Sequence, residues 1–345
     1  MGLLNITTEY IGLDIGSSAI RFVELRKGSE NPALALYGSI PMPEGLAASD
    51  APGDQAKIAA LVSKLLKDSG VTAKTAVAGL PSNKIFTSVI TTPKLDNAEL
   101  SKAIKYQAEQ YIPMAMDQVK LDYSVIGQSA DGTTLDILLV AAPVSVVTKY
   151  ANILELAGME LMALEPNAVA AGRALVTSKE IAVVVLDINS FDSDITIINA
   201  DVPRLIRSVS VGGTTFVKAV AQNLGLDEAQ AEQFTSKFGL TQTKLEGQVY
   251  KAIKPSLDSL VSEIAKSVNF FKSQSPDVKL EKLVITGSAI SLPELAPYLA
   301  TATGMPVEFG NPWSHVSYPS GSQENLMAIS SEFGVAAGLA LRSYI

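Results

Sequence analysis

One pattern occurs twice in the sequence: an apolar run that ends in aspartate, a short polar turn, and two further runs in which apolar residues alternate. The first copy reads YIGLDIGSSAIRFVEL over residues 10–25 and continues as PALALYGSI over 32–40. The second copy, IAVVVLDINSFDSDITIINADVPRLIRSVSVGG, begins at Ile181. Alternation with period two predicts β-strands, so each copy predicts an antiparallel three-stranded meander. The duplication therefore predicts a chain built from two related halves.

Each copy places a carboxylate where a strand meets a turn. Asp14 precedes Gly16, Ser17 and Ser18 in the first copy, and Asp187 ends the corresponding strand of the second. A carboxylate beside a turn with free backbone N–H groups can hold a hydrated metal ion while the turn faces a phosphate. The residues leave one alternative open, an ordinary surface hairpin whose glycine supplies a positive φ.

A separate α+β unit is predicted between the two copies. Asp96 followed by Glu99 predicts the start of a helix, and Pro113 predicts its end. The predicted order is strand, helix, strand, strand, helix, over residues 85–91, 97–111, 119–127, 134–142 and 143–158. The domain organisation expected from this order is a first domain of residues 1–84 and 163–180, to which a helix at 333–345 returns, an inserted subdomain at 85–162, and a second domain at 181–332.

Other helix starts follow from local signals. Asp54 and Thr214 are predicted N-caps, and Asp227 with Gln230 predicts a further helix start. Apolar residues at steps of three and four predict one long helix, carried by Val249, Ile253, Leu257, Leu260, Ile264, Val268 and Phe271.

Composition excludes several classes of chemistry. The chain has 345 residues, no cysteine and one histidine, His315, so thiolate, Ser-His-Asp and histidine-rich zinc sites are excluded. The net charge of −8 argues against nucleic-acid binding. The N-terminus has neither a basic region nor a long apolar run, from which we expect a cytoplasmic protein. For His315 and Trp313, in a loop with proline and serine, we expect a packing or surface role.

The combined pattern resembles a known superfamily. Two aspartate-ended hairpins, small-residue helices at EPNAVAAGRAL and FGVAAGLAL, and a late strand that ends in Gly287-Ser288-Ala289 outline the actin-like ATPases. The inserted segment is more specific, since TPKLDNAELSKAIKYQAEQYIPMAMDQVKLDYSVIG and LDILLVAAPVSVVTKYANILELAGMELMALEPNAVA closely resemble the PilM family of type IV pilus assembly proteins. The resemblance covers nearly the whole chain. It implies an α/β, ribonuclease-H-like fold of two actin-like domains with an inserted subdomain of the FtsA type.

The resemblance also implies a site for ATP or ADP with Mg²⁺ in the cleft between the domains. Asp14 and Asp187 would hold the metal through water, and Glu165 would lie near the attacking water. The residues expected at the nucleotide are Asp14, Gly16, Ser17, Ser18, Arg21, Asp187, Asn189, Ser190, Ser193, Gly212, Gly213, Glu232, Gly287, Ser288 and Ala289. Backbone N–H groups and one cation suit phosphates, and carboxylates suit hydrated magnesium.

Three positions depart from the family pattern. Asn189 and Ser288 replace glycines, and Thr235 replaces a lysine. A side chain at Asn189 can obstruct the close approach of backbone to phosphate. The three departures weigh against nucleotide binding and more strongly against efficient hydrolysis, so we expect binding rather than rapid turnover. Because alternate strand residues face opposite sides, we expect at least one of Asp192 and Asp194 to be solvated. Glu165 has an alternative role, as a carboxylate that satisfies free N–H groups at a helix start.

For the family, the resemblance implies a scaffold at the inner face of the cytoplasmic membrane that docks the N-terminal peptide of the membrane protein PilN. The expected groove residues here are Ile85, Leu100, Ile104, Tyr111 and Pro113. Membrane contact would be indirect, and other platform proteins and self-association are further expected partners. A slow ATPase is the first alternative. An FtsA-like filament ranks below it, because the FtsA family carries an amphipathic tail and this sequence ends directly after the last predicted helix.

Overall fold

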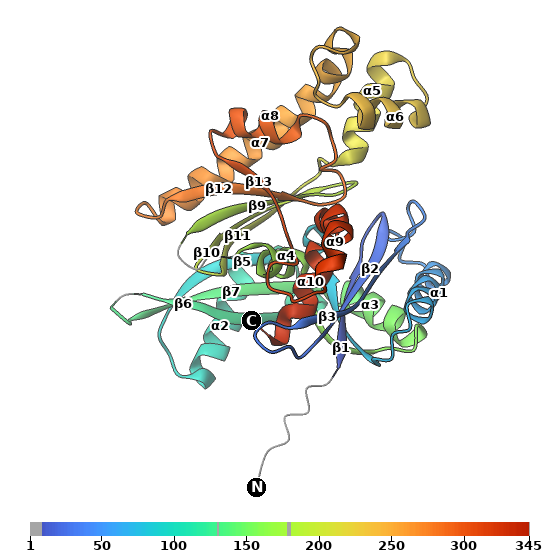
Figure 1. Cartoon of the computed structure of the whole chain (residues 1–345). Helices are drawn as coiled ribbons and strands as arrows, with labels where there is room; N and C mark the ends of the chain where they lie inside the picture. The colour runs from blue at the N-terminus through green and yellow to red at the C-terminus, as the bar shows by residue number, and fades with distance from the viewer. Residues whose placement is uncertain (1–8, 130, 178–180, 345) are drawn as a thin grey trace. The chain divides into compact units, whose positions relative to one another are not determined.

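The computed structural model describes residues 9–129, 131–177 and 181–344, which form two compact units (Figure 1). The first unit contains residues up to Pro81, 145–174 and those from Asn311 onward, and the second contains 82–144 and 175–310. Residues 1–8, 130, 178–180 and 345, which the predictions also cover, lie outside the described residues. The three-part division expected from the sequence is finer than this one and stays a prediction.

The first unit is built on a five-stranded sheet with the order β3-β2-β1-β4-β8. β1 pairs antiparallel with β2 and β2 with β3, which confirms the first predicted meander. β1, β4 and β8 run parallel to one another. The strands are β1 (Tyr10–Ile15), β2 (Ala19–Arg26), β3 (Ala33–Pro41), β4 (Thr75–Leu80) and β8 (Glu160–Pro166).

The helices of this unit are α1 (Pro52–Asp68), α3 (Val144–Leu156), α4 (Asn167–Leu175), α9 (Gln323–Ile329) and α10 (Gly334–Ala340). The short α10 packs directly on β1 (Figure 1), where the Tyr10 hydroxyl donates to the Ala340 carbonyl at 2.8 Å. One glycine allows α10 to pack on β1, and a second allows it to pack on α4. A Cβ added at Gly12 would overlap the Ala336 carbonyl oxygen, and one added at Gly338 would overlap that of Ala170.

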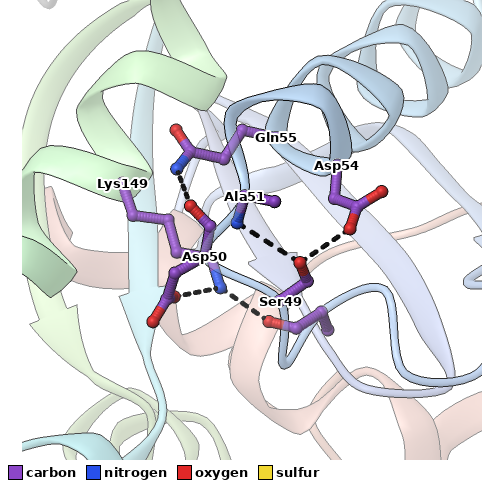
Figure 2. Close-up of polar contacts among 7 residues, drawn as sticks. Ser49, Asp50, Ala51, Asp54, Gln55 and Lys149 are labelled. Atoms are coloured by element: carbon purple, nitrogen blue, oxygen red, sulfur yellow. Dashed lines mark hydrogen bonds and ion pairs between the residues drawn. The ribbon is translucent and has the colours of Figure 1, made fainter.

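The start of α1 differs from the prediction. Its N-cap is Ala51, with Pro52 in the first turn, and Asp54 lies inside the helix. Proline is favoured at the first helical position because it lacks the N–H that would otherwise be unpaired there. The Asp54 carboxylate instead accepts the Ser49 hydroxyl at 2.6 Å, which holds the preceding loop (Figure 2).

The helix α3 also attaches to this loop. Figure 2 shows Lys149 of α3 pointing toward Asp50, with an ammonium-to-carboxylate distance of 3.1 Å. The same ammonium donates to the Ala47 carbonyl at 2.8 Å, and the Gln55 amide of α1 donates to the Asp50 carbonyl at 2.9 Å. These bonds explain why α3, which the sequence predicts as the last helix of the insertion, lies in the first unit.

An aromatic cluster closes the C-terminal part of the first unit. Trp313 is fully buried, and its ring centroid lies 6.1 Å from that of Tyr37 and 5.6 Å from that of Phe333. Its indole N–H donates to the Leu326 carbonyl at 2.9 Å, so the buried polar atom is satisfied. The packing role expected for Trp313 is confirmed.

The second unit repeats the arrangement in the sheet β11-β10-β9-β12-β13. β10 pairs antiparallel with both β9 and β11, which confirms the second predicted meander and the duplication. The elements are β9 (Ala182–Ile188), β10 (Ser193–Asn199), β11 (Val202–Val209), β12 (Leu280–Thr286), β13 (Val307–Phe309), α5 (Gly213–Leu224), α6 (Glu228–Phe238), α7 (Gln248–Gln274) and α8 (Leu295–Thr303).

The helices of the second unit follow most of the predictions. Asp227 caps α6 as expected, and its carboxylate accepts the Gln230 N–H at 2.8 Å. The periodic face of α7 packs into the core with β9, β10 and β12. The cap predicted at Thr214 is wrong by two residues. The N-cap of α5 is Gly212, because the Thr215 hydroxyl, rather than the Thr214 side chain, bonds back to the cap residue.

The inserted segment forms the three-stranded sheet β5-β7-β6 with one helix on it. Its elements are β5 (Phe86–Pro93), α2 (Asn97–Tyr111), β6 (Val119–Gln128) and β7 (Thr134–Pro143). Asp96 caps α2, as predicted, by accepting the N–H groups of Ala98 and Glu99, each at 2.9 Å. Arg204 of β11 donates to Asp136 of β7 at 2.7 Å and so joins this sheet to the second meander. The short 3₁₀ segments are η1 (Ser82–Lys84), η2 (Met116–Gln118), η3 (Leu245–Gly247), η4 (Ser320–Ser322), η5 (Ser330–Glu332) and η6 (Leu341–Ser343).

Candidate functional site

The first hairpin holds Asp14 near the end of β1 and Arg21 directly opposite on β2. The Gly16 N–H donates to the Ala19 carbonyl at 3.0 Å and closes the turn. Gly16 does not have a positive φ. Its missing side chain matters for another reason, since a Cβ there would lie 2.9 Å from the Ala19 oxygen. The glycine therefore serves a close backbone approach in a tight turn that carries Ser17 and Ser18.

The carboxyl group of Asp14 is poorly solvated. Burial raises its pKa from 3.8 to about 6, and the nearby Arg21 guanidinium opposes part of that rise. Arg21 is shared, because its Nε donates to the Glu332 carboxylate at 3.2 Å and its Nη2 bonds the same oxygen. At neutral pH Asp14 is thus an ionised, buried group with partial charge compensation. A cation at this point would stabilise it.

The second hairpin brings Asp187 of β9 next to the loop after β12. The Asn189 N–H donates to the Asp192 carbonyl at 2.9 Å, which closes the turn, and the Ala289 N–H donates to the Ile188 carbonyl at 2.9 Å. Gly287 has φ 103°, and a Cβ there would lie 2.5 Å from a carboxylate oxygen of Asp187. Here a left-handed backbone and a close approach both require glycine. The structure thus brings together Asp187, Asn189, Gly287, Ser288 and Ala289.

The N-terminus of α5 lies against the same turn. The N–H of Gly213 donates to the Asn189 carbonyl at 2.9 Å, and that of Thr214 donates to the Ser190 carbonyl at 2.8 Å. The Gly212 N–H donates to the Thr215 hydroxyl at 3.2 Å. Gly212 and Gly213 were expected at the nucleotide, but their N–H groups are bonded within the chain, and a phosphate would have to replace their present acceptors. A Cβ at Gly212 would lie 2.5 Å from the Asn189 oxygen, so this glycine allows the turn to pack.

Asp192 and Asp194 both contact η1. The Ser82 hydroxyl donates to Asp194 at 2.6 Å, and the Asn83 amide donates to Asp192. Burial raises the pKa of both carboxyl groups, to about 6 for Asp194, where Ser82 opposes the rise and Asp192 adds to it. Asp194 is buried, whereas Asp192 is only partly buried, so the expectation that at least one of them is solvated stays a prediction for Asp192. Asp192 precedes β10, so strand alternation does not separate the two side chains.

The remaining predicted nucleotide residues differ in exposure. Glu232 is exposed on α6, and Thr235, one turn further on, is buried. The Thr235 hydroxyl has no hydrogen-bond partner among the described residues. The buried Ser193 donates its hydroxyl to the Val211 carbonyl at 2.6 Å, which gives it a structural role next to the α5 N-terminus.

Glu165 lies at the end of β8 and is paired with Arg173 of α4. The guanidinium contacts both carboxylate oxygens, with one nitrogen-to-oxygen distance of 2.9 Å. Arg173 was missed as a functional residue from the sequence, although one signal was present. It is the one basic residue in the segment EPNAVAAGRAL, most of whose residues are small or apolar.

The predicted partner residues divide into buried and exposed positions. Leu100 and Ile104 are 3% and 0% exposed, because they pack into the core between α2 and its sheet. They present no surface to a partner, so only Ile85, Tyr111 and Pro113 remain as predicted contacts. Tyr111 is 51% exposed, and Tyr106 on the same helix is 69% exposed and was not predicted.

Neither a metal-binding cluster nor a membrane-spanning helix occurs in the described part of the chain. Within residues 9–129, 131–177 and 181–344, no cluster of three or more acidic, histidine or cysteine side chains could hold a metal ion. No helix in these ranges is both long and apolar enough to cross a membrane.

Comparison with known proteins identifies the relatives of this chain. The sequence matches the family of type IV pilus assembly protein PilM over residues 12–344. A chain of the PilM–PilN type IV pilus biogenesis complex is similar, with 28% identity, TM-score 0.85, and coverage of 98% of this chain and 99% of that one.

Two more distant structures share the fold. The ethanolamine utilization protein EutJ from Carboxydothermus hydrogenoformans has 14% identity, TM-score 0.57 and coverage of 96% and 88%. MreB5 of Spiroplasma citri bound to ADP has 12% identity, TM-score 0.54 and coverage of 96% and 95%. The predicted α/β, actin-like fold is confirmed. With the match over residues 12–344, these findings show that the chain belongs to the PilM family of type IV pilus assembly proteins.

Proposed function

We propose that this chain is a scaffold of the type IV pilus assembly platform that docks the N-terminal peptide of a PilN-like membrane protein. The observation that carries the proposal is the similarity, at 28% identity and TM-score 0.85 over 98% of the chain, to a protein of the PilM–PilN complex. Contact with the membrane would then pass through the partner. An extended peptide suits this role, because main-chain bonds and side-chain pockets share its recognition.

The docking test is calorimetry with a synthetic PilN-like N-terminal peptide, with and without Mg-ATP. We expect saturable binding at a one-to-one ratio. Absence of binding in both conditions would refute the docking proposal, whereas binding only with Mg-ATP would make the nucleotide a regulator of docking.

Two tyrosines of α2 provide a matched pair of variants. Tyr111→Ser removes an exposed side chain that the proposal places at the peptide, and Tyr106→Ser removes one that it does not. We expect the first to weaken peptide binding and the second to leave it unchanged. Equal effects would show that the peptide does not use the end of α2 near Pro113.

We further propose that the chain binds ATP or ADP with Mg²⁺ through the two aspartate hairpins. MreB5, which shares the fold, is bound to ADP, and the buried carboxyl of Asp14 beside the Gly16 turn supports a cation there. The residues that would hold the group are Asp14, Ser17, Ser18, Arg21 and Asp187. When bound, the metal would neutralise the phosphates, and the turn amides would orient them.

The nucleotide test is calorimetric titration with Mg-ATP and with Mg-ADP. Asp14→Ala should abolish binding, while Asp68→Ala, which removes an exposed carboxylate of the same unit, should leave the affinity unchanged. Wild-type protein that binds neither nucleotide would refute this part of the proposal and leave peptide docking to stand on its own test.

A further inference from the structure

Arg173 joins three elements of the first unit at one point. Its Nη1 donates to a carboxylate oxygen of Glu165 on β8 at 2.9 Å and to the Gly338 carbonyl of α10 at 2.8 Å. Its Nη2 donates to the other carboxylate oxygen of Glu165. Both oxygens of Glu165 are therefore engaged by one guanidinium on α4. The planar fork of arginine makes this two-point contact, which a lysine ammonium cannot reproduce.

The pair is shielded from water and closely surrounded. The side chains of Arg173 and Glu165 are 16% and 10% exposed. A Cβ at Gly338 would overlap the Ala170 carbonyl, so α10 lies against α4 with no space for a side chain between them. In such a place a bidentate ion pair is held by its surroundings, and removing one partner leaves the other charge buried.

The position of this pair bears on the proposed nucleotide site. Family resemblance assigns Glu165 to the neighbourhood of the attacking water. To orient or deprotonate a water molecule, a carboxylate oxygen must lie within hydrogen-bond reach of that water. Here the guanidinium pairs with both oxygens and directs the carboxylate into the α4–α10 contact, and only 10% of the Glu165 side chain is exposed, so little of it can be reached by water.

We propose that Arg173 is a positioning residue that withholds Glu165 from water, so that the chain keeps a bound nucleotide without hydrolysing it efficiently. This inference rests on the proposed nucleotide binding. It assigns the low turnover that we expect to one ion pair, in addition to the departures at Asn189, Thr235 and Ser288.

The first test needs no nucleotide. Carbodiimide-activated coupling of glycine ethyl ester, mapped by peptide mass spectrometry, reports how accessible each carboxyl group is. Arg173→Met should raise the labelling of Glu165 severalfold, while Asp14, a buried carboxyl of the same unit, serves as the internal control and should not change. Unchanged labelling of Glu165 would show that Arg173 does not withhold it.

The second test measures ATP turnover together with nucleotide affinity. Arg173→Met should raise turnover at least about tenfold at unchanged affinity, a small part of the ~10²–10⁴ that a positioned base contributes. Adding Glu165→Gln to this variant should remove the gain, because the gain depends on the freed carboxylate. If the methionine variant does not fold, Arg173→Lys, which releases one carboxylate oxygen, should show a smaller gain in both tests.

The possible results are distinguishable. Variants that bind nucleotide like the wild type but show neither more labelling nor more turnover would overturn this inference alone. A gain in turnover that persists with Glu165→Gln would also overturn it. Absence of nucleotide binding in the wild type would refute the proposed nucleotide function, and this inference with it.

Discussion

Replacing Asp14 by asparagine should stabilise the protein at neutral pH, although it removes a residue of the proposed nucleotide site. Asp14 is 7% exposed, and burial raises its pKa from 3.8 to about 6. Because the pKa of this carboxyl group is higher in the folded state, the folded protein binds its proton more tightly than the unfolded chain does between pH 3.8 and about pH 6. The free energy of unfolding therefore falls as pH rises through this window, and the whole loss, which is the cost of ionising the buried carboxyl group, is reached above about pH 6.

The size of the cost follows from the two pKa values. The difference between 3.8 and about 6, at 1.36 kcal/mol for each pKa unit, gives about 3 kcal/mol. Asparagine is nearly isosteric and never ionises, so it avoids this cost, and Arg21 keeps its pair with Glu332. At roughly 2–4 °C for each kcal/mol in a unit of this size, the melting temperature should rise by about 6–12 °C at pH 7.5.

The assay is thermal unfolding followed by fluorescence across pH 3.5–8. Trp313 is the only tryptophan in the chain and lies in the same unit as Asp14, so its emission reports the unit that contains the substitution. Asp68→Asn, at an exposed position of the same unit, is the matched control and should follow the wild-type curve at every pH. The Asp14 variant should match the wild type near pH 3.5 and exceed it increasingly up to about pH 6.

Two results would refute this reasoning. A variant equally or less stable than the wild type at pH 7.5 would show that the folded protein bears no desolvation cost at Asp14. A gain of the same size at pH 3.5 and pH 7.5 would show that the effect does not come from ionisation. The expected result is a protein that gains stability and loses nucleotide affinity, as is common where a destabilising group serves function.

Three further predictions concern packing, capping and the join between the two sheets of the second unit. Gly338→Ala should lower the free energy of unfolding by at least about 1–3 kcal/mol, because the added Cβ would overlap a backbone oxygen of α4. Gly53→Ala, which has open space around it, should not lower this free energy, so equal melting curves for the two variants would contradict the prediction. Asp96→Ala should lower the free energy of unfolding by about 1 kcal/mol and speed the hydrogen exchange of backbone amides at the start of α2. Unchanged exchange there would mean that the Asp96 cap does not stabilise the first turn of the helix. Arg204→Met and Asp136→Asn should be non-additive by about 0.5–3 kcal/mol in a denaturant double-mutant cycle, and strict additivity would show that their 2.7 Å contact does not join the sheets.

Much of the local structure was predictable because its causes lie within a few residues. The two meanders follow from alternation, and the caps at Asp96 and Asp227 follow from a side chain that reaches an N–H two or three residues away. The start of α1 was misplaced although its determinants are local, because Pro52 competes with Asp54 as a start signal and proline defines the first turn.

The candidate site was predictable only in part. Asp14 and Asp187 come at strand ends in a repeated pattern, so their location could be inferred from the sequence alone. The partners that set their chemistry could not. Arg21 is shared with Glu332, and Asp194 takes a hydrogen bond from Ser82, a residue 112 positions away. No periodicity or spacing encodes which side chain meets a given carboxylate across such separations.

The sequence by itself determined the duplication and the placement of the two acidic hairpins, because hydrophobic periodicity and turn residues act over short range, while the actin-like class followed from its resemblance to a known superfamily. Only the tertiary structure decided that α3 attaches to the first unit, that the α5 amides are bonded to the second turn, and that Glu165 is held by Arg173. These outcomes depend on side chains and carbonyls that meet only after packing. Each buried polar group needs a hydrogen-bond partner, and the packed structure decides which of several possible partners it takes.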